Sequence, residues 1–520
     1  MSPEFLEKHD KKITRIFEIL PGLLTWLTIL SPIWLGFLYP RAVVYILTFL
    51  TMYWCYMAFM NTLGLVVGYP KHKKEMATDW WVKCQELNFD ELLEKDTLPP
   101  SLSEVKHFIL VPCVEEPYGV LKDNFDSILK QTFPTESITL VYALEERGAS
   151  QTRKNLDKIV GPYKDKFYDI KFFVHPAGIP GEAIGVGGAN RTWAAKHAVV
   201  EMKEVGVNLR NFIFSSLDCD HIPDPQYISR LTHLYLTTEK RDNHFYATAV
   251  HLFNNNLWRV PTMMRIEANF VTLGILSSRS IPRGLSSLTH DTFAAYSCSL
   301  QTLLDADFWD VQLGVDDTVF FWRAFFARDG DFKLAGHYIP YSADAVEGRN
   351  YWDSHKSLYK QLLRWGWGVL VVPLSVKGFL KNKKVSVWKK LLWTYNHFKT
   401  RVVMINMVFL LTFGFALLTL ANPDVKQSSF AYSLPDTMSL VLTVTLIFLA
   451  PPFYYRNKLA PPKPKEWPWW KKILVDFEGV LVIVNLLTFS FFPFVDAHTR
   501  MMFGKKMKDL YHTPKFRKNA

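Results

Sequence analysis

Long apolar runs near both ends of the chain constrain its fold more than any other feature of the sequence. Residues 20–39 and 42–67 contain no charged side chain, and each run is long enough to cross a hydrocarbon core of about 30 Å as a helix. Residues 402–421, 438–455 and 473–495 form three similar runs. We therefore expect an integral membrane protein whose first two runs form an antiparallel transmembrane hairpin.

The segment between these runs, residues 70–400, has the mixture of charge, Gly and Pro that is typical of a water-soluble domain. Strand-like and helix-like patterns alternate along its first half. This alternation predicts βαβ units, with a mainly parallel sheet and helices on both of its faces. The expected strands are 105–114, 138–144, 170–175 and 211–217, and the expected helices are 119–131, 154–163 and 190–204.

The placement of positive charge predicts the orientation in the membrane. The formal net charge is +11, and Lys and Arg gather before the first run, after the second run and in the loop 456–472. By the positive-inside rule, the N-terminus, the inserted domain and this loop are cytoplasmic. The basic C-terminal tail is expected on the same side, although five crossings would leave it on the other.

Composition also restricts the partners. The five cysteines show no paired or metal-type spacing, which fits a reducing compartment. No basic stripe lies on a recognisable nucleic-acid-binding module, so a nucleic-acid partner is not expected. The lipid bilayer is the expected partner, and the plasma membrane is the expected location.

Two aspartates follow the expected strand 211–217 directly. Asp218 and Asp220 are one residue apart, and Pro223 stops the extended segment. Side chains at i and i+2 of an extended segment point to the same side, so both carboxylates should converge at the C-terminal edge of the sheet, where open α/β sheets bind ligands. Paired carboxylates suit a hard divalent cation that also contacts substrate phosphates. The pattern indicates an enzyme for a nucleotide diphosphate, and the alternative is an ordinary surface turn.

Further acidic and aromatic motifs follow the same order along the chain. Glu115 comes after the first expected strand, and Glu145 comes after the second. Asp316 and Asp317 begin an expected helix. A Gln-x-x-Arg-Trp motif at 361–365 precedes an apolar, aromatic stretch, which we expect to lie at the membrane surface as an amphipathic helix.

With these residues in this order, the chain resembles the membrane-embedded family-2 glycosyltransferases, the group that contains cellulose, chitin and hyaluronan synthases. The resemblance covers about residues 100–370 and the apolar runs on both sides. The family's ordered set is an acidic residue after the first strand, an Asp-x-Asp, a Thr/Glu-Asp pair and Gln-x-x-Arg-Trp. The resemblance implies a GT-A-like (Rossmann-like) α/β catalytic domain in the cytoplasm, inserted between N- and C-terminal transmembrane helices.

The resemblance also implies roles at the donor side. A nucleotide sugar, with UDP as the expected nucleotide, would bind together with Mg²⁺ or Mn²⁺, and the metal would stabilise the diphosphate leaving group as a Lewis acid. Asp220 is the expected direct metal ligand, with Asp218 as a second ligand near the ribose or donor sugar. Glu115 and Glu145 are expected to contact the nucleotide. Arg364 is expected to bind the diphosphate through a bidentate fork.

At the acceptor side, an inverting transfer needs a base for the proton of the acceptor hydroxyl. Asp317 resembles the family's general base, and Asp316 is expected to raise the pKa of that base by like-charge repulsion. Trp365 is expected to stack on a sugar ring, with Gln361 donating or accepting a hydrogen bond nearby.

Each residue has a simpler explanation on its own. Asp316 and Asp317 suit the N-terminus of a helix, where acidic side chains cap the backbone and favour the dipole. Trp365 suits a membrane interface, and Arg364 suits the cytoplasmic side of a membrane. Glu145 begins a run of charges that solvent alone would explain. The combination favours the catalytic interpretation, because one structural accident does not predict the next motif.

Two regions depart from the family pattern. Many relatives have a lysine shortly before the asparagine that corresponds to Asn190, whereas here glycines precede it and the nearest basic residue is Arg191. The tail segment 510–515 partly resembles the Phe-x-Val-Thr-x-Lys gating loop of cellulose synthases, with Thr513 and Lys515 retained. As such a loop, it would cover the bound nucleotide and lie in the cytoplasm.

The leading hypothesis is a processive, inverting synthase that extends a β-linked polysaccharide and passes it through its own transmembrane helices. The first alternative is a single addition to a lipid acceptor, such as a polyprenyl phosphate or diacylglycerol. A transporter with a nucleotide-binding domain is a third hypothesis, but the apolar runs lack the intramembrane charge pairs that mark ion pathways. The sequence does not specify the donor sugar.

The expected organisation has five parts. They are 1–69, a cytoplasmic N-terminus and the transmembrane hairpin; 70–364, the catalytic domain; 365–400, interfacial amphipathic helices; 401–497, the C-terminal transmembrane helices; and 498–520, the basic tail with the possible gating loop.

Overall fold

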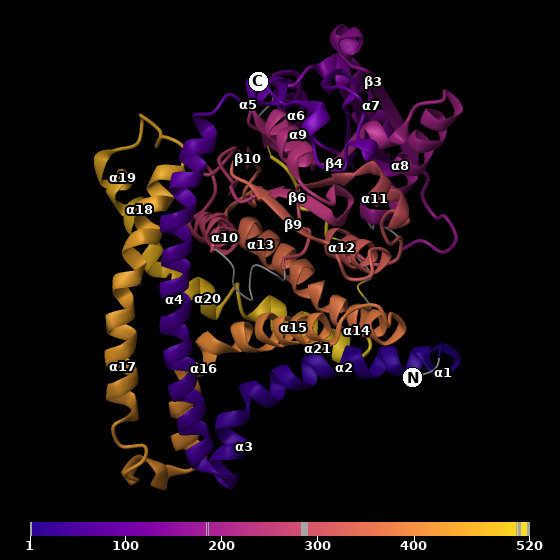
Figure 1. The fold of residues 1–520 in the computed structure, drawn as a ribbon. Helices are drawn as coiled ribbons and strands as arrows, with labels where there is room; N and C mark the ends of the chain where they lie inside the picture. Colours follow the sequence, from indigo (N-terminus) through magenta and orange to yellow (C-terminus); the bar gives the residue numbers. More distant parts are fainter. Residues whose placement is uncertain are drawn as a thin grey trace. The chain divides into compact units, whose positions relative to one another are not determined.

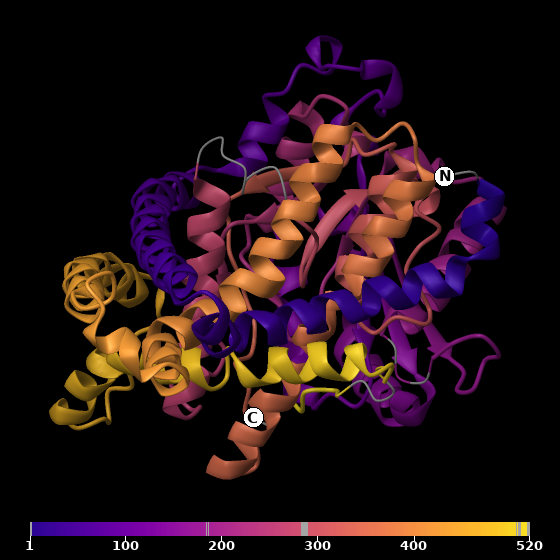
Figure 2. The ribbon, with the colours of Figure 1, turned by 90° about the horizontal axis from the view of Figure 1, so that it is seen from below.

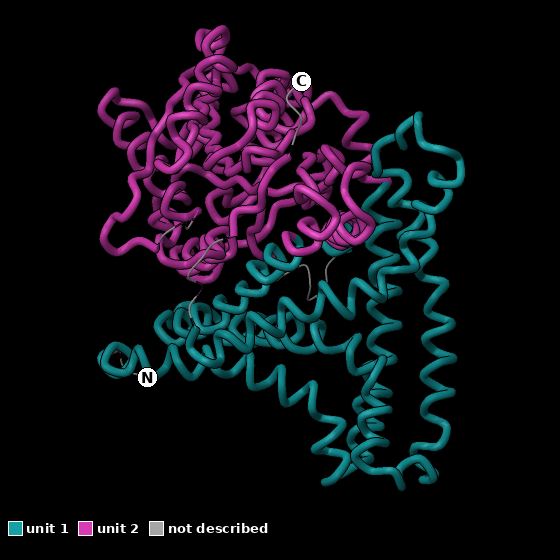
Figure 3. Tube along the Cα trace, turned by 180° about the vertical axis from the view of Figure 1, so that it is seen from behind, with its two compact units in different colours: residues 1–69, 276–282, 358–506 teal, residues 70–275, 283–357, 507–520 magenta. Residues whose placement is uncertain are grey.

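The computed structural model describes residues 3–183, 185, 187–281, 290–505, 507 and 511–516. The chain divides into two compact units, which Figure 3 shows in different colours. Unit 1 consists of residues 1–69, 276–282 and 358–506, and unit 2 consists of residues 70–275, 283–357 and 507–520. The end of the tail therefore belongs to unit 2, although 149 residues of unit 1 precede it in the sequence.

A seven-stranded sheet forms the centre of unit 2 (Figure 1). In sheet order its strands are β3 (Asp169–His175), β2 (Ile138–Glu145), β1 (Lys106–Cys113), β4 (Phe212–Ser216), β8 (Tyr296–Ser299), β6 (His244–Thr248) and β9 (Lys333–His337). The first four strands are mutually parallel, as are β6 and β9, whereas β8 is antiparallel to β4 and β6. The prediction of a mainly parallel sheet is confirmed. A second sheet joins the short strands β5 (Ile222–Pro223), β10 (Tyr341–Ser342) and β7 (His251–Leu252).

Helices cover both faces of the seven-stranded sheet, as the alternating pattern predicts. On one face lie α6 (Tyr118–Leu129), α7 (Glu146–Val160) and α9 (Tyr227–Thr237), and on the other lie α8 (Gly187–Glu204), α11 (Leu300–Asp305) and α12 (Asp316–Ala327). Ile109 and Tyr142 are fully buried in the first layer. In the second layer, the ring of Trp309 packs between those of Phe214 and Phe320, at centroid distances of 5.5 and 5.7 Å. The remaining helices are α5 (Trp80–Gln85), α10 (Thr262–Ser280) and α13 (Tyr351–Gly366), of which α10 and α13 continue into unit 1.

Unit 1 consists of helices. They are α1 (Pro3–Lys8), α2 (Asp10–Ile29), α3 (Ser31–Leu38), most of α4 (Pro40–Met76), α14 (Val371–Lys381), α15 (Val387–Phe398), α16 (Met404–Ala421), α17 (Leu434–Thr445), α18 (Ala450–Leu459), α19 (Trp469–Phe477), α20 (Val482–Leu487) and α21 (Phe492–Met502). In the described part of the chain, four helical stretches are long and apolar enough to cross a membrane: Pro40–Met76, Val387–Ala421, Leu434–Leu459 and Trp469–Met502. The second of these runs from α15 into α16 through a π-helical turn, Lys399–Val403.

The first apolar run, predicted as one spanning helix, is broken. The axes of α2 and α3 are bent by 64° at Leu30. Pro32 lies in the first turn of α3 and explains the break, since proline has no N–H group and its ring clashes with the preceding turn. α2 lies along α21, as Figure 2 shows, and also packs on α14. The two helices count as a fifth spanning stretch only when the bent pair is taken as one.

Close packing of small residues organises unit 1 around α4. α4, α16 and α17 share an apolar core that includes Leu47, Leu410 and Met438. Gly68 of α4 leaves room for the side chain of Ser280, and one turn earlier the hydroxyl of Ser277 donates to the carbonyl of Asn61 at 2.9 Å. In an apolar environment, small residues of this kind allow helix backbones to approach closely.

Candidate active site

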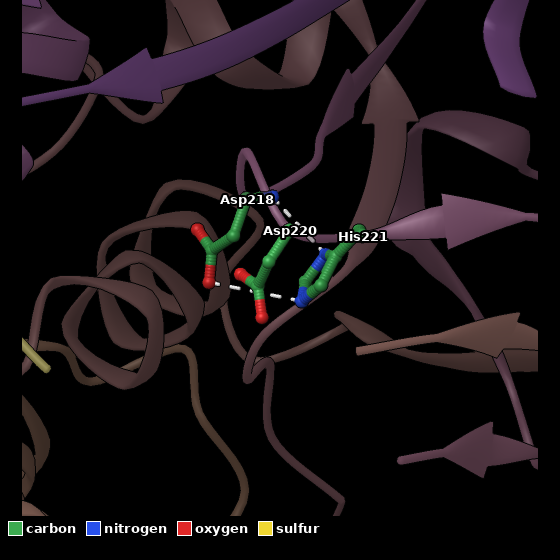
Figure 4. Close-up of side chains that lie close together, drawn as sticks. All are labelled: Asp218, Asp220 and His221. Atoms are coloured by element: carbon green, nitrogen blue, oxygen red, sulfur yellow. Dashed lines mark hydrogen bonds and ion pairs between the residues drawn. The ribbon is translucent and has the colours of Figure 1, made fainter. Parts of the chain in front are cut away.

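Asp218 and Asp220 lie in the turn that follows β4, at the carboxyl edge of the parallel strands. The ladder between β1 and β4 extends to Leu217, whose N–H donates to the carbonyl of Leu110 at 3.0 Å. Both carboxylates point to the same side of the turn (Figure 4). Oxygens of the two carboxylates and a ring nitrogen of His221 lie within 4.8 Å of one another. The carboxylates thus converge as their i, i+2 spacing predicts.

His221 orients Asp218. The backbone N–H of Asp218 donates to Nδ1 of His221 at 3.0 Å, so Nδ1 carries no proton. In the neutral ring the proton is therefore on Nε2, which lies 3.8 Å from Oδ2 of Asp218. An N–H group directed at a carboxylate is a donor and does not ligate a metal. The two aspartates are consequently the candidate metal ligands of this cluster.

Asp220 is buried, and a cation lies against it. Nζ of Lys515 donates to Oδ2 of Asp220 at 2.7 Å, and the backbone N–H of Asp344 donates to the same oxygen at 2.9 Å. Burial alone would raise the pKa of Asp220, but Lys515 and His221 hold that pKa well below its usual range. Asp220 is therefore ionised at neutral pH, in a place that accommodates positive charge.

Arg191 connects the Asp-x-Asp turn to the start of α12. Its side chain is only 7% exposed, and its Nη2 donates to Oδ1 of Asp218 at 2.8 Å. Its Nη1 donates to Oδ2 of Asp316. Burial would raise the pKa of Asp218, but the electrostatic interaction with His221 and Arg191 lowers it. The donor-side and acceptor-side carboxylates of the sequence prediction thus meet at one guanidinium.

Asp316 and Asp317 are the first two residues of α12, where free N–H groups and the helix dipole favour negative charge. Asp317 has a different environment from its neighbour. Its Oδ1 is shielded from solvent and has no hydrogen-bond partner within the described residues. Burial raises the pKa of Asp317 to about 8; Arg191 opposes this shift, whereas Asp316 and Asp218 add to it by repulsion. A carboxylate with such a pKa is suited to accept a proton.

The carboxylate after β1 that faces the turn is Glu116. Glu115, the predicted nucleotide contact, is exposed, whereas Glu116 is 4% exposed and accepts a hydrogen bond from the N–H of Val114 at 2.7 Å. Burial raises the pKa of Glu116 to about 7, although a hydrogen bond from Cys219 in the Asp-x-Asp turn acts in the opposite direction and lowers it. Nε2 of His512 in the tail lies 3.5 Å from Oε1 of Glu116.

Glu145 lies at the end of β2, as predicted, and is paired with a histidine. Nδ1 of His175, at the end of β3, lies 3.4 Å from Oε2 of Glu145, and Nε2 of His175 lies 2.7 Å from Oε2 of Glu182. Burial would lower the pKa of His175, but the two glutamates raise it. The contact of Glu145 with a nucleotide stays a prediction.

The other predicted residues lie on the tail and on α13. Thr513 is buried within unit 2. Gln361, Arg364 and Trp365 are partly exposed and lie on the last turns of α13, in the segment that belongs to unit 1. Their roles in donor and acceptor binding stay predictions.

The donor set of the Asp-x-Asp turn fits a divalent metal. Asp218 and Asp220 present carboxylate oxygens, the ligands that Mg²⁺ and Mn²⁺ prefer. The ammonium group of Lys515 on Asp220 indicates that this oxygen favours a positive partner. Asp218 keeps a side chain that is 38% exposed, so a ligand has access to it.

Several residues of this site were not predicted from the sequence. His221 and Glu116 are adjacent to predicted residues, and that adjacency was the available signal. Asp344 follows β10, and it reaches Asp220 from 124 positions away. In the sequence, Arg191 stands out only as the basic residue nearest to Asn190, because its two carboxylate partners are distant along the chain.

No protein-family model and no curated protein matches the chain. Among solved structures, it is similar to the mannosyltransferase PcManGT from Pyrobaculum calidifontis in complex with GDP-Man and Mn²⁺, at 13% identity and a TM-score of 0.41, over 86% of this chain and 99% of that one. It is also similar to S. aureus TarS 1–349 in complex with UDP-GlcNAc, at 11% identity and a TM-score of 0.36, over 77% of this chain and 93% of that one. Because these similarities are low, the function is inferred from the chain's own residues.

Proposed function

We propose that this chain is a membrane-bound, metal-dependent glycosyltransferase that uses a nucleotide sugar, with UDP as the expected nucleotide. One observation carries the proposal. Arg191 joins the aspartate pair that suits a metal and diphosphate to the aspartate pair that includes a buried base. A transferase of this type needs both functions in one site.

At the donor end, Asp218 and Asp220 would hold Mg²⁺ or Mn²⁺, which neutralises charge on the departing diphosphate when it is bound. Both carboxylates have lowered pKa values, so they are ready to ligate without losing a proton. Glu116 joins Glu115 and Glu145 as a candidate for contacts with the nucleotide. Lys515 would move from Asp220 to the phosphates.

At the acceptor end, Asp317 would accept the proton of the acceptor hydroxyl. The hydroxyl oxygen forms a bond to the anomeric carbon, while the bond to the diphosphate oxygen breaks and the nucleoside diphosphate leaves with the electron pair. Displacement from the opposite side inverts the anomeric configuration. The raised pKa of Asp317 matches this task, because general bases are most effective when their pKa lies near the working pH.

The membrane arrangement follows from the unit to which the tail belongs. Unit 2 begins within the last turns of α4 and includes tail residues 511–516, which supports placing the catalytic domain and the tail on the same side of the membrane. The charge distribution favours the cytoplasm as that side. The chain between residues 357 and 507 must then cross the membrane an even number of times. We propose that Val387–Ala421 and Leu434–Leu459 cross and that Trp469–Met502 returns without crossing, since it is broken into three α-helices and carries the acidic Asp476 and Glu478 in its first part.

We further propose that the acceptor is a growing β-linked polysaccharide, on which Trp365 would stack. The experiment uses the full chain in nanodiscs, a panel of UDP- and GDP-sugars, and Mg²⁺ or Mn²⁺. Nucleotide release and product length are measured. Release of nucleotide with long polymer supports the whole proposal, and a single-sugar glycolipid as sole product overturns the polymer part. No release from any donor with either metal overturns the transferase itself.

A further inference from the structure

We infer that Arg191 is a positioning residue that ties Asp316 to Asp218, so that Asp317 alone of its pair is left to take up the acceptor proton. This inference rests on the proposed transferase function and divides the roles of the two adjacent aspartates. Asp316 accepts the guanidinium through Oδ2, whereas no hydrogen-bond donor within the described residues reaches Oδ1 of Asp317. Arg191 contacts the carboxylates of Asp218 and Asp316 and acts through these two groups, which it orients.

The first turn of α8 is built to hold Arg191 still. On one side of it, the amide of Asn190 donates to the carbonyl of Ala143 in β2 at 2.9 Å. On the other side, the hydroxyl of Thr192 donates to the carbonyl of Trp309 at 3.2 Å. A side chain placed between two such anchors loses little further freedom when it binds, and rigid support of this kind is what sites require.

Two glycines let α8 approach Asp316. A Cβ atom on Gly187 would lie 3.0 Å from Nη1 of Arg191 and 3.1 Å from Oδ2 of Asp316, on the ion pair itself. A Cβ atom on Gly188 would lie 3.0 Å from Cβ of Asp316. At these distances a Cβ atom would force its neighbours to move by a few tenths of an ångström, so glycine at both positions leaves the Arg191–Asp316 pair undisturbed.

The electrostatic consequence falls on Asp317. Among the described residues, the charged and titratable groups that act on it include Arg191 from α8, Asp316 beside it, Asp218 from the turn after β4, and Tyr296 from β8. The N–H of Ala294 also donates to its carboxylate. Arg191 is the one positive charge in this group, and it favours the ionised form of Asp317.

The test compares Arg191→Met and Arg191→Lys with the wild-type protein in nanodiscs, using kcat/KM for the donor between pH 5.5 and 9. Removal of the charge in Arg191→Met should move the acidic limb of the profile upward by about one pH unit. Arg191→Lys should keep the limb in place and lower kcat/KM by about tenfold, because one ammonium group does not bridge two carboxylates in a planar fork. An unmoved limb in Arg191→Met overturns the inference, since a purely structural role would not shift it.

A double-mutant cycle with Asp316→Asn gives a second readout. If Arg191 acts through Asp316, adding Asp316→Asn to Arg191→Lys should cause little further loss, and an additive loss overturns the inference. Because the cycle uses Arg191→Lys, it still tests the inference if Arg191→Met does not fold. Arg210→Met, at an exposed arginine, is the matched control. Wild-type protein that releases no nucleotide overturns the proposed function and this inference with it, whereas active wild-type protein with an unmoved limb in Arg191→Met overturns only the inference.

Discussion

Two pairs of aspartates lie in unit 2, and their surroundings differ. Asp218 and Asp220 each accept a hydrogen bond from a cationic side chain, and both have lowered pKa values. At the start of α12, Asp316 is paired with Arg191, while burial raises the pKa of Asp317 to about 8. The same residue type therefore provides ionised metal ligands at one end of the site and a proton acceptor at the other.

The difference comes from the partners and not from the motif. Asp218 and Asp220 are separated by one residue in a turn, so each meets its own cation. Asp316 and Asp317 are adjacent on a helix and point in different directions, so a single guanidinium serves only one of them directly. Environments that push the pKa values of carboxylates apart are a general route to acid–base function.

The largest effect is expected at the proton acceptor. Asp317→Asn should lower kcat for nucleotide release by about 10³-fold at pH 8, because the amide accepts no proton, and general bases contribute roughly 10²–10⁴-fold. Asp316→Asn should cost less, since Asp316 acts through position. Asp165→Asn, at an exposed aspartate, is the control. Equal losses of kcat in Asp317→Asn and Asp316→Asn would mean that the two aspartates do not have separate roles.

Substitutions at Asp218 and Asp220 should change the affinity for the metal. Asp220→Asn should weaken Mn²⁺ binding by about 100-fold, measured by electron paramagnetic resonance titration, because a neutral amide oxygen replaces a charged ligand. Asp317→Asn should leave Mn²⁺ affinity within about twofold, since it lies outside the ligand pair. Similar losses of Mn²⁺ affinity in both variants would mean that Asp317 also contributes to metal binding, which contradicts the separation of the two aspartate pairs.

The layered α/β fold was predictable because it depends on local patterns. Alternating apolar segments place β1 to β4 and α6 to α8 within a few residues of their observed bounds, except for the early start of α7. The antiparallel placement of β8 depends on pairing with β4 across 82 positions, which no local pattern records. Hydropathy likewise predicted the first apolar run as one span, because it is insensitive to the single proline that bends it.

The sequence was sufficient to predict the motifs of the site, but not the hydrogen-bond partners of their side chains. The i, i+2 spacing is enough to make Asp218 and Asp220 converge. The choice between Glu115 and Glu116 depends on the turn after β1, where a shift of one residue exchanges the buried and the exposed carboxylate. The pairing of Arg191 with Asp316 spans 125 positions and depends on how α8 packs against α12.

The pH dependence of stability should have opposite signs at the two ends. The pKa of Asp317 is raised from its ordinary value of 3.8 to about 8, so its contribution to stability is full below pH 4 and is lost as the pH rises toward 8. The pKa of Asp218 is lowered, so its contribution is present above pH 4 and is lost as the pH falls further. Between pH 5 and 8, Asp317 should reduce stability by at most about 1.4 kcal/mol per pH unit. Thermal melting of the wild type and of Asp317→Asn checks this, and parallel pH trends would contradict it.

The smallest effect is expected from the tail lysine, and it tests how the metal end is held ionised. In Lys515→Met, a metal no longer has to displace an ammonium group from Asp220, so Mn²⁺ should bind the nucleotide-free protein about three- to tenfold more tightly. The KM for the donor should rise by a similar factor if the same lysine then serves the phosphates. Lys83→Met, at an exposed ion pair with Glu86, is the matched control. Weaker Mn²⁺ binding in Lys515→Met would mean that the tail helps to assemble the ligand pair, and the cation on Asp220 would then be a support for the metal and not its competitor.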